Sequence, residues 1–309
     1  MKKLLIVLLV LTVAAIVAGA VYESKMEVKD AQAWTAPGRL VDIAGRKLHV
    51  NCAGQGGAPT VVFESSGLSS STEWDKLLPE VGRTHHACAY DRAGMGWSDP
   101  VSGVRSASDF VEELRAVLAS VGEKPPYVLV GHSAGGVLAR AFQSAHPEEV
   151  AGLVLVDTAT ASVLDRWPKV SAKMRSNLQR GRWLAAVSAL RLADPLHLGG
   201  RDAALTYRPR TMLAADQLVA AAAAILPSLP PTLPVPTVVL THGRGGDWAG
   251  PGVVGPLDEA AIEYDWQGAQ RELAKGPKSS LVVADKSGHM IPTEEPERIV
   301  QAIESVTRP

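Results

Sequence analysis

Short apolar runs recur along most of this 309-residue chain and constrain its fold more than any other feature. Six runs of four residues are almost continuously apolar, as parallel strands are when both faces of their sheet are covered. They occupy residues 60–63, 87–90, 127–130, 153–156, 237–240 and 281–284. Residues 40–43 and 47–52 flank a turn at Gly45 and predict an additional N-terminal hairpin. The sequence therefore predicts a mostly parallel sheet preceded by a hairpin.

Helical patterns fill most of the gaps between the predicted strands. In residues 110–121 the apolar side chains recur at helical spacing. We expect Asp109 to be the N-cap of this helix and Gly122 to end it. The alternation of strands and helices predicts the α/β class.

The interval from residue 158 to residue 236 contains no convincing strand. Helical patterns dominate it, most clearly in residues 211–226, and a Pro-rich stretch from Pro227 leads back to the sheet. We therefore expect a helical cap at residues 159–235, inserted between two parts of an α/β core at residues 35–158 and 236–309.

Residues 1–24 are expected to form a targeting segment. Two lysines precede an apolar run at residues 4–21, and charged residues follow it at once, a pattern that indicates export. The run is also just long enough to span a bilayer, while the small residues 18–20 fit a cleavage site. A cleaved signal peptide and a retained membrane anchor both stay open. The expected location is periplasmic or extracellular, or anchored to the membrane through residues 4–21.

Charge and cysteine content narrow the functional classes. The chain has 31 basic and 32 acidic side chains and no extended basic cluster, which argues against a nucleic-acid partner. Its two cysteines, Cys52 and Cys88, are too few to bind zinc on their own. After export they can pair as a disulfide or remain as small buried side chains. The sequence implies no metal and no organic cofactor.

The strongest chemical motif follows the predicted strand at residues 127–130. Residues 131–135 read G-H-S-A-G, which satisfies G-x-S-x-G between a strand and a helix. We expect the glycines to be required because a Cβ at either position would collide with the strand or the helix. Ser133 is therefore the candidate nucleophile. The backbone N–H of Ala134, in the first helical turn, would help to stabilise an oxyanion.

A serine hydroxyl needs a base within hydrogen-bond reach, and histidine has a suitable pKa. Of the eight histidines, His289 is the best candidate because it follows the last predicted strand, at the carboxyl edge of the sheet. His242 also follows a strand and is a weaker candidate. The other six, including His132 inside the motif, are expected to be structural or surface residues.

Together with three further segments, these residues resemble the α/β-hydrolase superfamily. Residues 66–68 resemble its oxyanion turn, residues 91–99 resemble its D-R-x-G-x-G-x-S segment, and Gly288-His289 followed by Pro296 resembles its closing G-H…P segment. The resemblance covers nearly the whole chain after the targeting segment. It implies the α/β-hydrolase fold and an oxyanion hole in which the backbone N–H of Leu68 joins that of Ala134.

The sequence looks most like exported or membrane-anchored bacterial hydrolases in which cysteines at the positions of Cys52 and Cys88 recur. The resemblance favours a disulfide between neighbouring strands, with a role in stability rather than in chemistry.

The third catalytic residue must be a carboxylate that holds the imidazole and stabilises the imidazolium. Asp157 directly follows the rigid strand at residues 153–156, whereas Asp247 lies in a glycine-rich loop, where a fixed orientation costs more entropy. The family uses either strand end. We favour Asp157 and keep Asp247 as the alternative.

A serine at position 133 excludes the dehalogenase and epoxide hydrolase branches of the superfamily, which require an aspartate there. The predicted reaction is hydrolysis of a small-molecule carboxylic ester through an acyl-enzyme, with Ser133, His289 and Asp157 as the triad. Rival reactions on the same triad are amide, lactone or C–C bond hydrolysis. A catalytically silent, ligand-binding relative is the alternative from another functional class.

Overall fold

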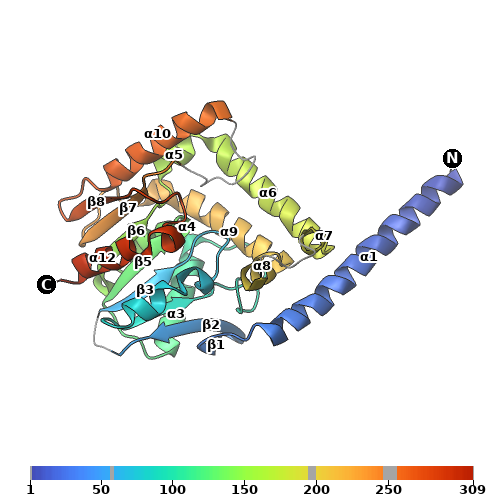
Figure 1. Cartoon of the computed structure of the whole chain (residues 1–309), viewed down its shortest axis with the longest axis horizontal. Coiled ribbons are helices and arrows are strands. Elements are labelled where there is room, and N and C mark those ends of the chain that lie inside the picture. The colour runs from blue at the N-terminus through green and yellow to red at the C-terminus, as the bar shows by residue number, and fades with distance from the viewer. Residues whose placement is uncertain (1, 56–58, 194–199, 246–255, 309) are drawn as a thin grey trace.

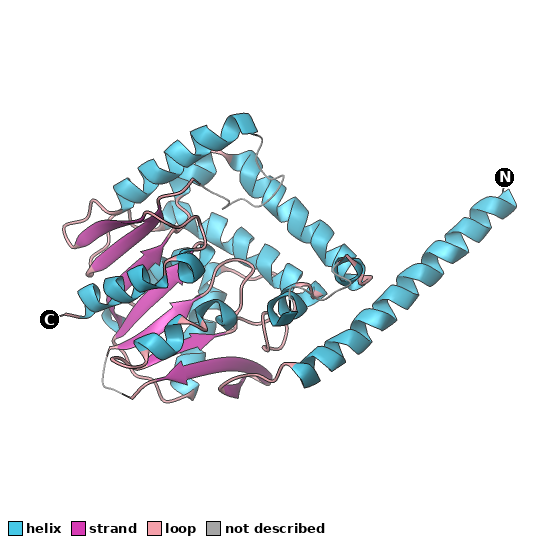
Figure 2. Ribbon diagram, in the orientation of Figure 1, coloured by secondary structure: helices cyan, strands magenta, loops and turns pink. Residues whose placement is uncertain are grey.

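The computed structural model describes residues 2–55, 59–193, 200–245 and 256–308. The described chain forms an eight-stranded sheet in the order β1-β2-β4-β3-β5-β6-β7-β8, flanked by helices (Figures 1 and 2). The strands are β1 (Arg39–Ile43), β2 (Arg46–Ala53), β3 (Thr60–Glu64), β4 (Ala87–Tyr90), β5 (Tyr127–His132), β6 (Val150–Val156), β7 (Thr237–His242) and β8 (Ser279–Ala284). All eight predicted strands are present, and the predicted α/β-hydrolase fold is confirmed.

Only β2 runs against the rest of the sheet. β1 pairs antiparallel with β2, and β2 pairs antiparallel with β4. The other six strands are parallel. The carboxyl ends of β5 to β8 therefore lie side by side, and this edge carries every candidate catalytic residue that the structure describes.

Both faces of the sheet are covered, which explains why the strands are apolar without alternation. Leu129 of β5 packs in a core with α3 (Ala107–Ser120) and α4 (Ala134–Ala145). Its neighbours on the same strand face the opposite core, which is formed with α2 (Leu77–Val81) and α12 (Pro296–Thr307). The motifs at the strand ends are thus held by a scaffold that is buried on both sides.

The start of α3 differs from the expected one. Ser106 is its N-cap: the Ser106 hydroxyl accepts from the Asp109 N–H, and the Asp109 carboxylate accepts from the Ser106 N–H. Asp109 is therefore the third residue of a capping box and not the cap itself. Gly122 follows the helix with a φ of 87°, as expected for a glycine after a helix end.

Between β6 and β7 the described residues form helices and no strand. We call α5 to α9 the cap helices. They are α5 (Ala161–Arg166), α6 (Pro168–Ala186), α7 (Ala189–Leu192), α8 (Gly200–Thr206) and α9 (Pro209–Ile225). α9 is the helix predicted at residues 211–226, and it packs on α3, α4 and α6. After β7 the chain forms α10 (Pro256–Leu273), β8, and α11 (Ile291–Glu294) before α12.

The N-terminal segment forms one helix, α1 (Lys2–Ala33), which projects from the body of the molecule (Figure 1). Two described helical stretches are long and apolar enough to cross a membrane by length and composition. The most apolar part of α1 has no buried residue, whereas 44% of the corresponding window in Pro209–Ser228 is buried. Packing within the folded domain therefore explains why the second stretch is apolar, but it does not explain why α1 is apolar.

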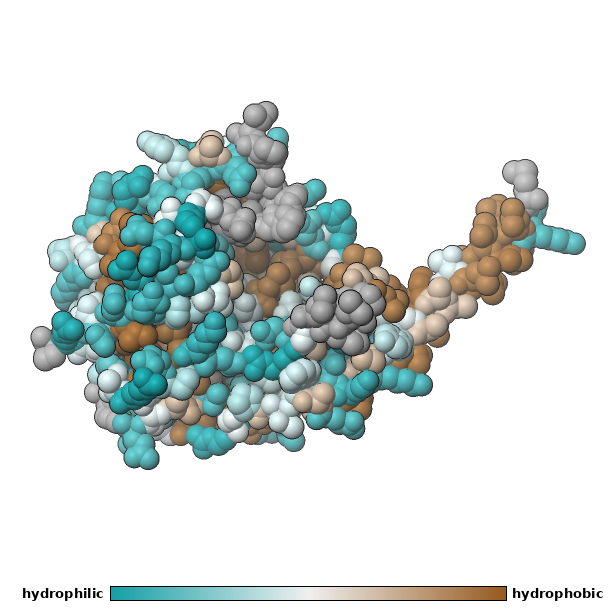
Figure 3. Space-filling model, viewed as in Figure 1, coloured by the Kyte–Doolittle hydropathy of each residue, from teal (hydrophilic) through white to brown (hydrophobic). Residues whose placement is uncertain are grey.

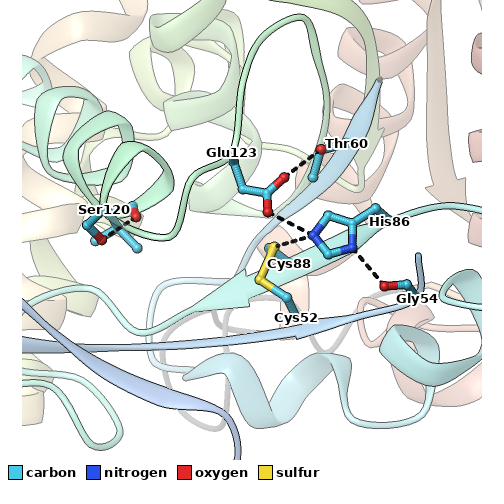
Figure 4. The surroundings of a disulfide bond; sticks show 8 residues. Cys52, Gly54, Thr60, His86, Cys88, Ser120 and Glu123 are labelled. Carbon is cyan, nitrogen blue, oxygen red and sulfur yellow. Dashed lines mark hydrogen bonds and ion pairs between the residues drawn. A yellow bond between two sulfur atoms is a disulfide. The ribbon is translucent and has the colours of Figure 1, made fainter. Parts of the chain in front are cut away.

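Cys52 and Cys88 face each other on β2 and β4 and form a disulfide with an S–S distance of 2.07 Å (Figure 4). Beside the bridge, His86 Nε2 bonds to Glu123 at 2.8 Å, and its Nδ1 bonds to the Gly54 carbonyl at 3.0 Å. The bridge between neighbouring strands that the family resemblance implies is present.

Candidate active site

The candidate nucleophile lies at a sharp turn from β5 into α4. Ser133 has φ 54° and ψ −119°, an unfavourable conformation for a residue with a Cβ. A Cβ added to Gly135 would lie 2.4 Å from the carbonyl oxygens of Glu64 and Ser65, and one on Gly131 would lie 2.6 Å from the Gly135 oxygen. The expected steric requirement for both glycines is confirmed.

The structure brings two of the predicted site residues together at the carboxyl edge of the sheet. His289 Nδ1 donates to Asp157 Oδ2 at 2.6 Å, although the two residues are 132 positions apart. Asp157 directly follows β6, and its backbone N–H donates to the Leu240 carbonyl of β7 at 2.7 Å. The alternative acid, Asp247, lies outside the described residues.

The Asp157 carboxylate is fully buried and receives several hydrogen bonds. His242 Nδ1 donates to the same Oδ2 at 2.7 Å, and Trp266 Nε1 donates to Oδ1 at 2.9 Å. Thr241 Oγ1 adds a longer bond to Oδ1 at 3.2 Å. Burial favours the neutral acid, but the hydrogen bonds from His242 and His289 outweigh it and hold the pKa of Asp157 well below its usual range.

His242 contributes to the site in a way that the sequence did not reveal. Its Nδ1 faces Asp157, and its Nε2 lies 2.9 Å and 3.0 Å from the two carboxylate oxygens of Glu263 on α10. Because both ring nitrogens face carboxylates, both carry a proton and the ring is a cation. Burial opposes this charge, but the bonds to Asp157 and Glu263 raise the pKa of His242 to about 9. The position of His242 after a strand was the only sequence signal.

The pKa of His289 is shifted in the opposite direction to that of His242. Burial lowers the pKa of His289 below its usual value, and its hydrogen bond to Asp157 opposes this shift only in part. The ring is therefore neutral at pH 7. Because Nδ1 carries the proton that it donates to Asp157, the lone pair is on Nε2. This is the tautomer that a general base requires.

A buried ion pair joins the turn at Ser133 to the candidate oxyanion turn. His132 Nδ1 donates to Glu73 Oε1 at 2.5 Å, and its Nε2 donates to the His289 carbonyl at 2.9 Å. The other Glu73 oxygen accepts from the Ser66 N–H at 2.7 Å. Burial opposes the charge on His132, but Glu73 raises its pKa above the usual value. His132 is structural, as expected, and Glu73 is a positioning residue that the sequence did not reveal.

Arg92, in the predicted D-R-x-G-x-G-x-S segment, also holds the candidate oxyanion turn in place. Its guanidinium donates to the carbonyl of Ser65 at 2.8 Å and to that of Ser66 at 2.5 Å, and it is paired with Glu64 at 2.8 Å. A charged side chain with three acceptors holds the backbone more firmly than a neutral one would. The residues that carry Leu68 are therefore anchored on their N-terminal side.

The two candidate oxyanion donors come from neighbouring segments. A Cβ built on Gly67 would lie 3.9 Å from the Ala134 Cβ, so the turn at residues 66–68 lies against the first turn of α4. Ala134 is the first residue of α4, and its N–H has no acceptor within the helix. The Leu68 side chain is 41% exposed. The two segments that carry the candidate donors therefore lie side by side.

Ser133 and His289 line one narrow cavity of about 70 Å³ between the sheet edge and the cap helices. Its walls come from the loop after β6 and from α5, α6, α9 and α10. Among the described residues that line it there is no Asp, Glu, Lys or Arg. The lining is Ser133, Ala134, Ala159, Val163, Leu164, Trp167, Val170, Ser171, Met174, Val219, Ala222, Ala223, Leu226, Trp266 and His289.

Asp157, His242 and His289 also have ligand atoms close enough together to hold a metal ion, all within 4.8 Å of one another. However, the Nδ1 atoms of both histidines already donate to the Asp157 carboxylate. Metal binding would require both of these hydrogen bonds to break. The hydrogen-bonded arrangement suits proton transfer better than metal coordination.

Comparison with known proteins agrees with the fold. Residues 50–302 match the sequence profile described as "Alpha/beta hydrolase family". Uncharacterized protein YqjL of Bacillus subtilis is 35% identical over 100 residues, which cover 32% of this chain and 40% of that protein. The chain matches only 20% to 40% of the length of the first curated relatives.

Two solved structures resemble the whole fold. A thermophilic esterase from Thermogutta terrifontis has a TM-score of 0.61 at 23% identity, with 86% of this chain and 94% of that chain covered. The enol-lactonase from Burkholderia xenovorans has a TM-score of 0.64 at 18% identity, with 87% and 99% covered. At these identities the likeness establishes the fold and not the substrate.

Proposed function

The chain belongs to the alpha/beta hydrolase family, and on that premise we propose that it is a serine hydrolase that cleaves carboxylic esters through an acyl-enzyme. The observation that carries this proposal is the placement of Ser133 and His289 in one cavity, with His289 Nδ1 bonded to Asp157 at 2.6 Å. A nucleophile and a neutral base then line one cavity, and an ionised acid holds the base through its Nδ1.

In the proposed mechanism His289 Nε2 takes the proton of the Ser133 hydroxyl as its oxygen attacks the ester carbonyl. The proton makes His289 a cation, which the Asp157 carboxylate stabilises. The tetrahedral intermediate collapses and expels the alcohol, which receives the proton from His289. Water, activated by the same imidazole, then attacks the acyl-enzyme and releases the acid.

We propose that the backbone N–H groups of Leu68 and Ala134 stabilise the oxyanion. The nearness of Gly67 to Ala134 supports this role, because Ala134 directly follows Ser133 and Leu68 directly follows Gly67. The anchoring of the turn by Arg92 and Glu73 supports it further. Such donors stabilise the transition state most when they are held in place before the reaction.

The cavity lining supports a neutral, apolar acyl group. A charged substrate would lose its hydration without gaining an ionic partner, because no charged side chain lines the described part of the cavity. An ester with an aliphatic acyl chain loses little on the same transfer and gains apolar contact with Val163, Val170 and Leu226.

We further propose that the chain has an α/β core at residues 35–158 and 236–309, a cap at residues 159–235, and a retained membrane anchor at residues 4–21. The contact between α1 and the cap supports retention. The Gly19 carbonyl accepts from the Ser188 hydroxyl at 3.1 Å, and Glu23 accepts from the same hydroxyl at 2.8 Å. The cap therefore contacts α1 within the small residues 18–20 and again at Glu23, just after them.

The test is hydrolysis of p-nitrophenyl esters, from acetyl to palmitoyl, by the full-length protein in detergent. We expect turnover that is lost by several orders of magnitude in Ser133→Ala while the circular dichroism spectrum is unchanged. Equal turnover in both proteins would refute the assignment of Ser133 as the nucleophile. Turnover of amides or lactones but of no acyclic ester would replace the ester proposal with one of the rival reactions.

A further inference from the structure

The cap helix α6 (Pro168–Ala186) has an unusual charge for this chain. It contains five basic residues and no acidic one, whereas the chain as a whole is balanced at 31 basic and 32 acidic side chains. Among the described residues, only Arg175 of these five forms an ion pair, with Asp216. Such an excess on one surface helix indicates an anionic partner.

The basic residues are ordered along one face of α6. Lys169, Lys173 and Arg180 are exposed and follow a spacing of four and seven residues, which places them on one side of the helix. Trp183 and Leu184 continue the same face at its C-terminal end and are 74% and 47% exposed. The opposite face is the one that packs inward, with Val170, Leu178 and Ala185 buried.

The end of this face is bound to α1 by buried polar contacts. Arg191 on α7 donates to Glu23 at 2.8 Å and forms an ion pair with Asp30 at 2.7 Å, and Ser188 donates to Glu23 at 2.8 Å. A Cβ on Gly19 would lie 2.5 Å from the Val187 carbonyl oxygen, so the two backbones are in contact. These contacts place the tip of the cap beside residues 19–23 of α1.

That position corresponds to one edge of the proposed membrane anchor. The apolar run at residues 4–21 is about 27 Å long as a helix, close to the roughly 30 Å thickness of the hydrocarbon core. If this run crosses the bilayer, the level of Glu23 is the water interface, and the tip of the cap must lie at the same level. Leu192, at the end of α7, is 65% exposed at this tip.

The direction of α6 agrees with a position along the bilayer surface. α6 runs transverse to α1 in Figure 1, so it extends along the surface that α1 would cross. Figure 3 shows hydrophobic surface along α1 and again on the edge of the cap that faces it. The apolar surface of the anchor is thus continued by the cap.

We propose that α6 and α7 form a second membrane contact, which binds a bilayer surface rich in anionic phospholipid. This inference rests on the anchor in the proposed function. Trp183, Leu184 and Leu192 enter the interface, where Trp is favoured, and the basic face binds the lipid headgroups.

The contact has a consequence for the substrate, because the inward face of α6 lines the catalytic cavity through Val170, Ser171 and Met174. One helix would then have the membrane on one side and the bound acyl group on the other. The ester class that fits this arrangement is one already dissolved in the bilayer.

The test measures the depth of Trp183 in vesicles. Full-length protein is reconstituted in phosphatidylcholine vesicles with brominated acyl chains, with and without phosphatidylglycerol. The quenching of Trp183 is the difference between the wild type and Trp183→Phe. The matched control is Val283→Trp in the Trp183→Phe background, because Val283 is 39% exposed on β8, on the side of the molecule away from α1 (Figure 1).

We expect strong quenching of Trp183 with phosphatidylglycerol and none of the tryptophan at position 283. Each basic side chain should favour the docked state by about fivefold, so the double variant Lys173→Gln/Arg180→Gln should weaken docking by roughly 25-fold. Arg182→Gln is the charge-matched control, since Arg182 is exposed on the same helix but outside the Lys169–Lys173–Arg180 face, and it should have little effect.

Quenching of Trp183 no stronger than that of the control would overturn the proposal. Equal quenching with and without phosphatidylglycerol would overturn its anionic part. Vesicle flotation of the same samples reports the anchor separately: protein that does not float refutes both the anchor and this inference. Ester hydrolysis in detergent is unaffected by either result and tests the proposed reaction independently.

Discussion

Replacing His242 with glutamine should raise the pKa of His289, the proposed base, without changing any residue that lines the cavity. His242 and His289 both donate to Asp157 Oδ2, at 2.7 Å and 2.6 Å, so their Nδ1 atoms are at most about 5.3 Å apart. In the wild-type protein the His242 cation opposes protonation of His289. In His242→Gln this repulsion is absent, and Asp157 and Glu263 both favour a protonated His289.

The size of the effect follows from Coulomb's law. Two unit charges about 5–7 Å apart interact by about 2–3 kcal/mol at an effective dielectric constant of about 20. This energy corresponds to roughly two pKa units, and relaxation of the neighbouring groups reduces it. We therefore expect the pKa of His289 to rise by about one to two units. Because the base must be neutral, the acidic limb of the activity profile should move to higher pH by the same amount.

The assay is the pH dependence of kcat/KM for p-nitrophenyl butyrate, from pH 4 to pH 10. Glu263→Gln is the control, because its amide oxygen can still accept from His242 while a negative charge is lost. Its acidic limb should move to lower pH or stay in place. An acidic limb that stays in place in His242→Gln, or the same upward shift in both variants, would show that the His242 cation does not lower the pKa of His289.

Three further predictions concern the acid, the disulfide and stability at low pH. Asp157→Asn should lower kcat/KM by about 10⁴-fold, whereas Asp247→Asn should leave it unchanged; the reverse pattern would show that Asp247 is the acid. The Cys52→Ala/Cys88→Ala variant should lose about 4 kcal/mol of unfolding free energy, because the bridge closes a loop with a separation of 36 residues; a urea midpoint equal to that of the wild type would contradict this. The pKa values of Asp91, Glu73 and Asp157 are lowered in the folded state, where hydrogen bonds and histidine partners outweigh burial. Their contribution to stability is therefore complete above their unfolded pKa of about 4 and is lost as the pH falls further. The midpoint of thermal unfolding should therefore fall below about pH 4. A midpoint that stays constant down to pH 2 would contradict this.

The strands were predictable because the signal is local. Each core strand has its apolar residues adjacent in sequence, and the glycines on either side of Ser133 predict a tight turn within five residues. The end of α3 was predictable from Gly122, but its start was not. Ser106 and Asp109 are both good N-cap residues, and only the backbone geometry shows which of them caps the helix.

The rest of the site depends on contacts between distant segments. The sequence left Asp157 and Asp247 as alternatives because it does not show which carboxylate reaches the imidazole across 132 residues. The pairing of His242 with Glu263 requires the packing of α10 on β7. Glu73 bonds to His132 across 59 positions and to a backbone N–H, and neither contact has a sequence motif.

Covalent labelling shows without a substrate whether Ser133 is an activated nucleophile, as we propose. The full-length protein is treated with a fluorophosphonate, digested and sequenced by mass spectrometry, beside His289→Ala and Ser133→Ala. We predict one adduct, on Ser133, that forms much more slowly in His289→Ala and is absent in Ser133→Ala. An adduct on another residue, or no adduct on the intact folded protein, would contradict it.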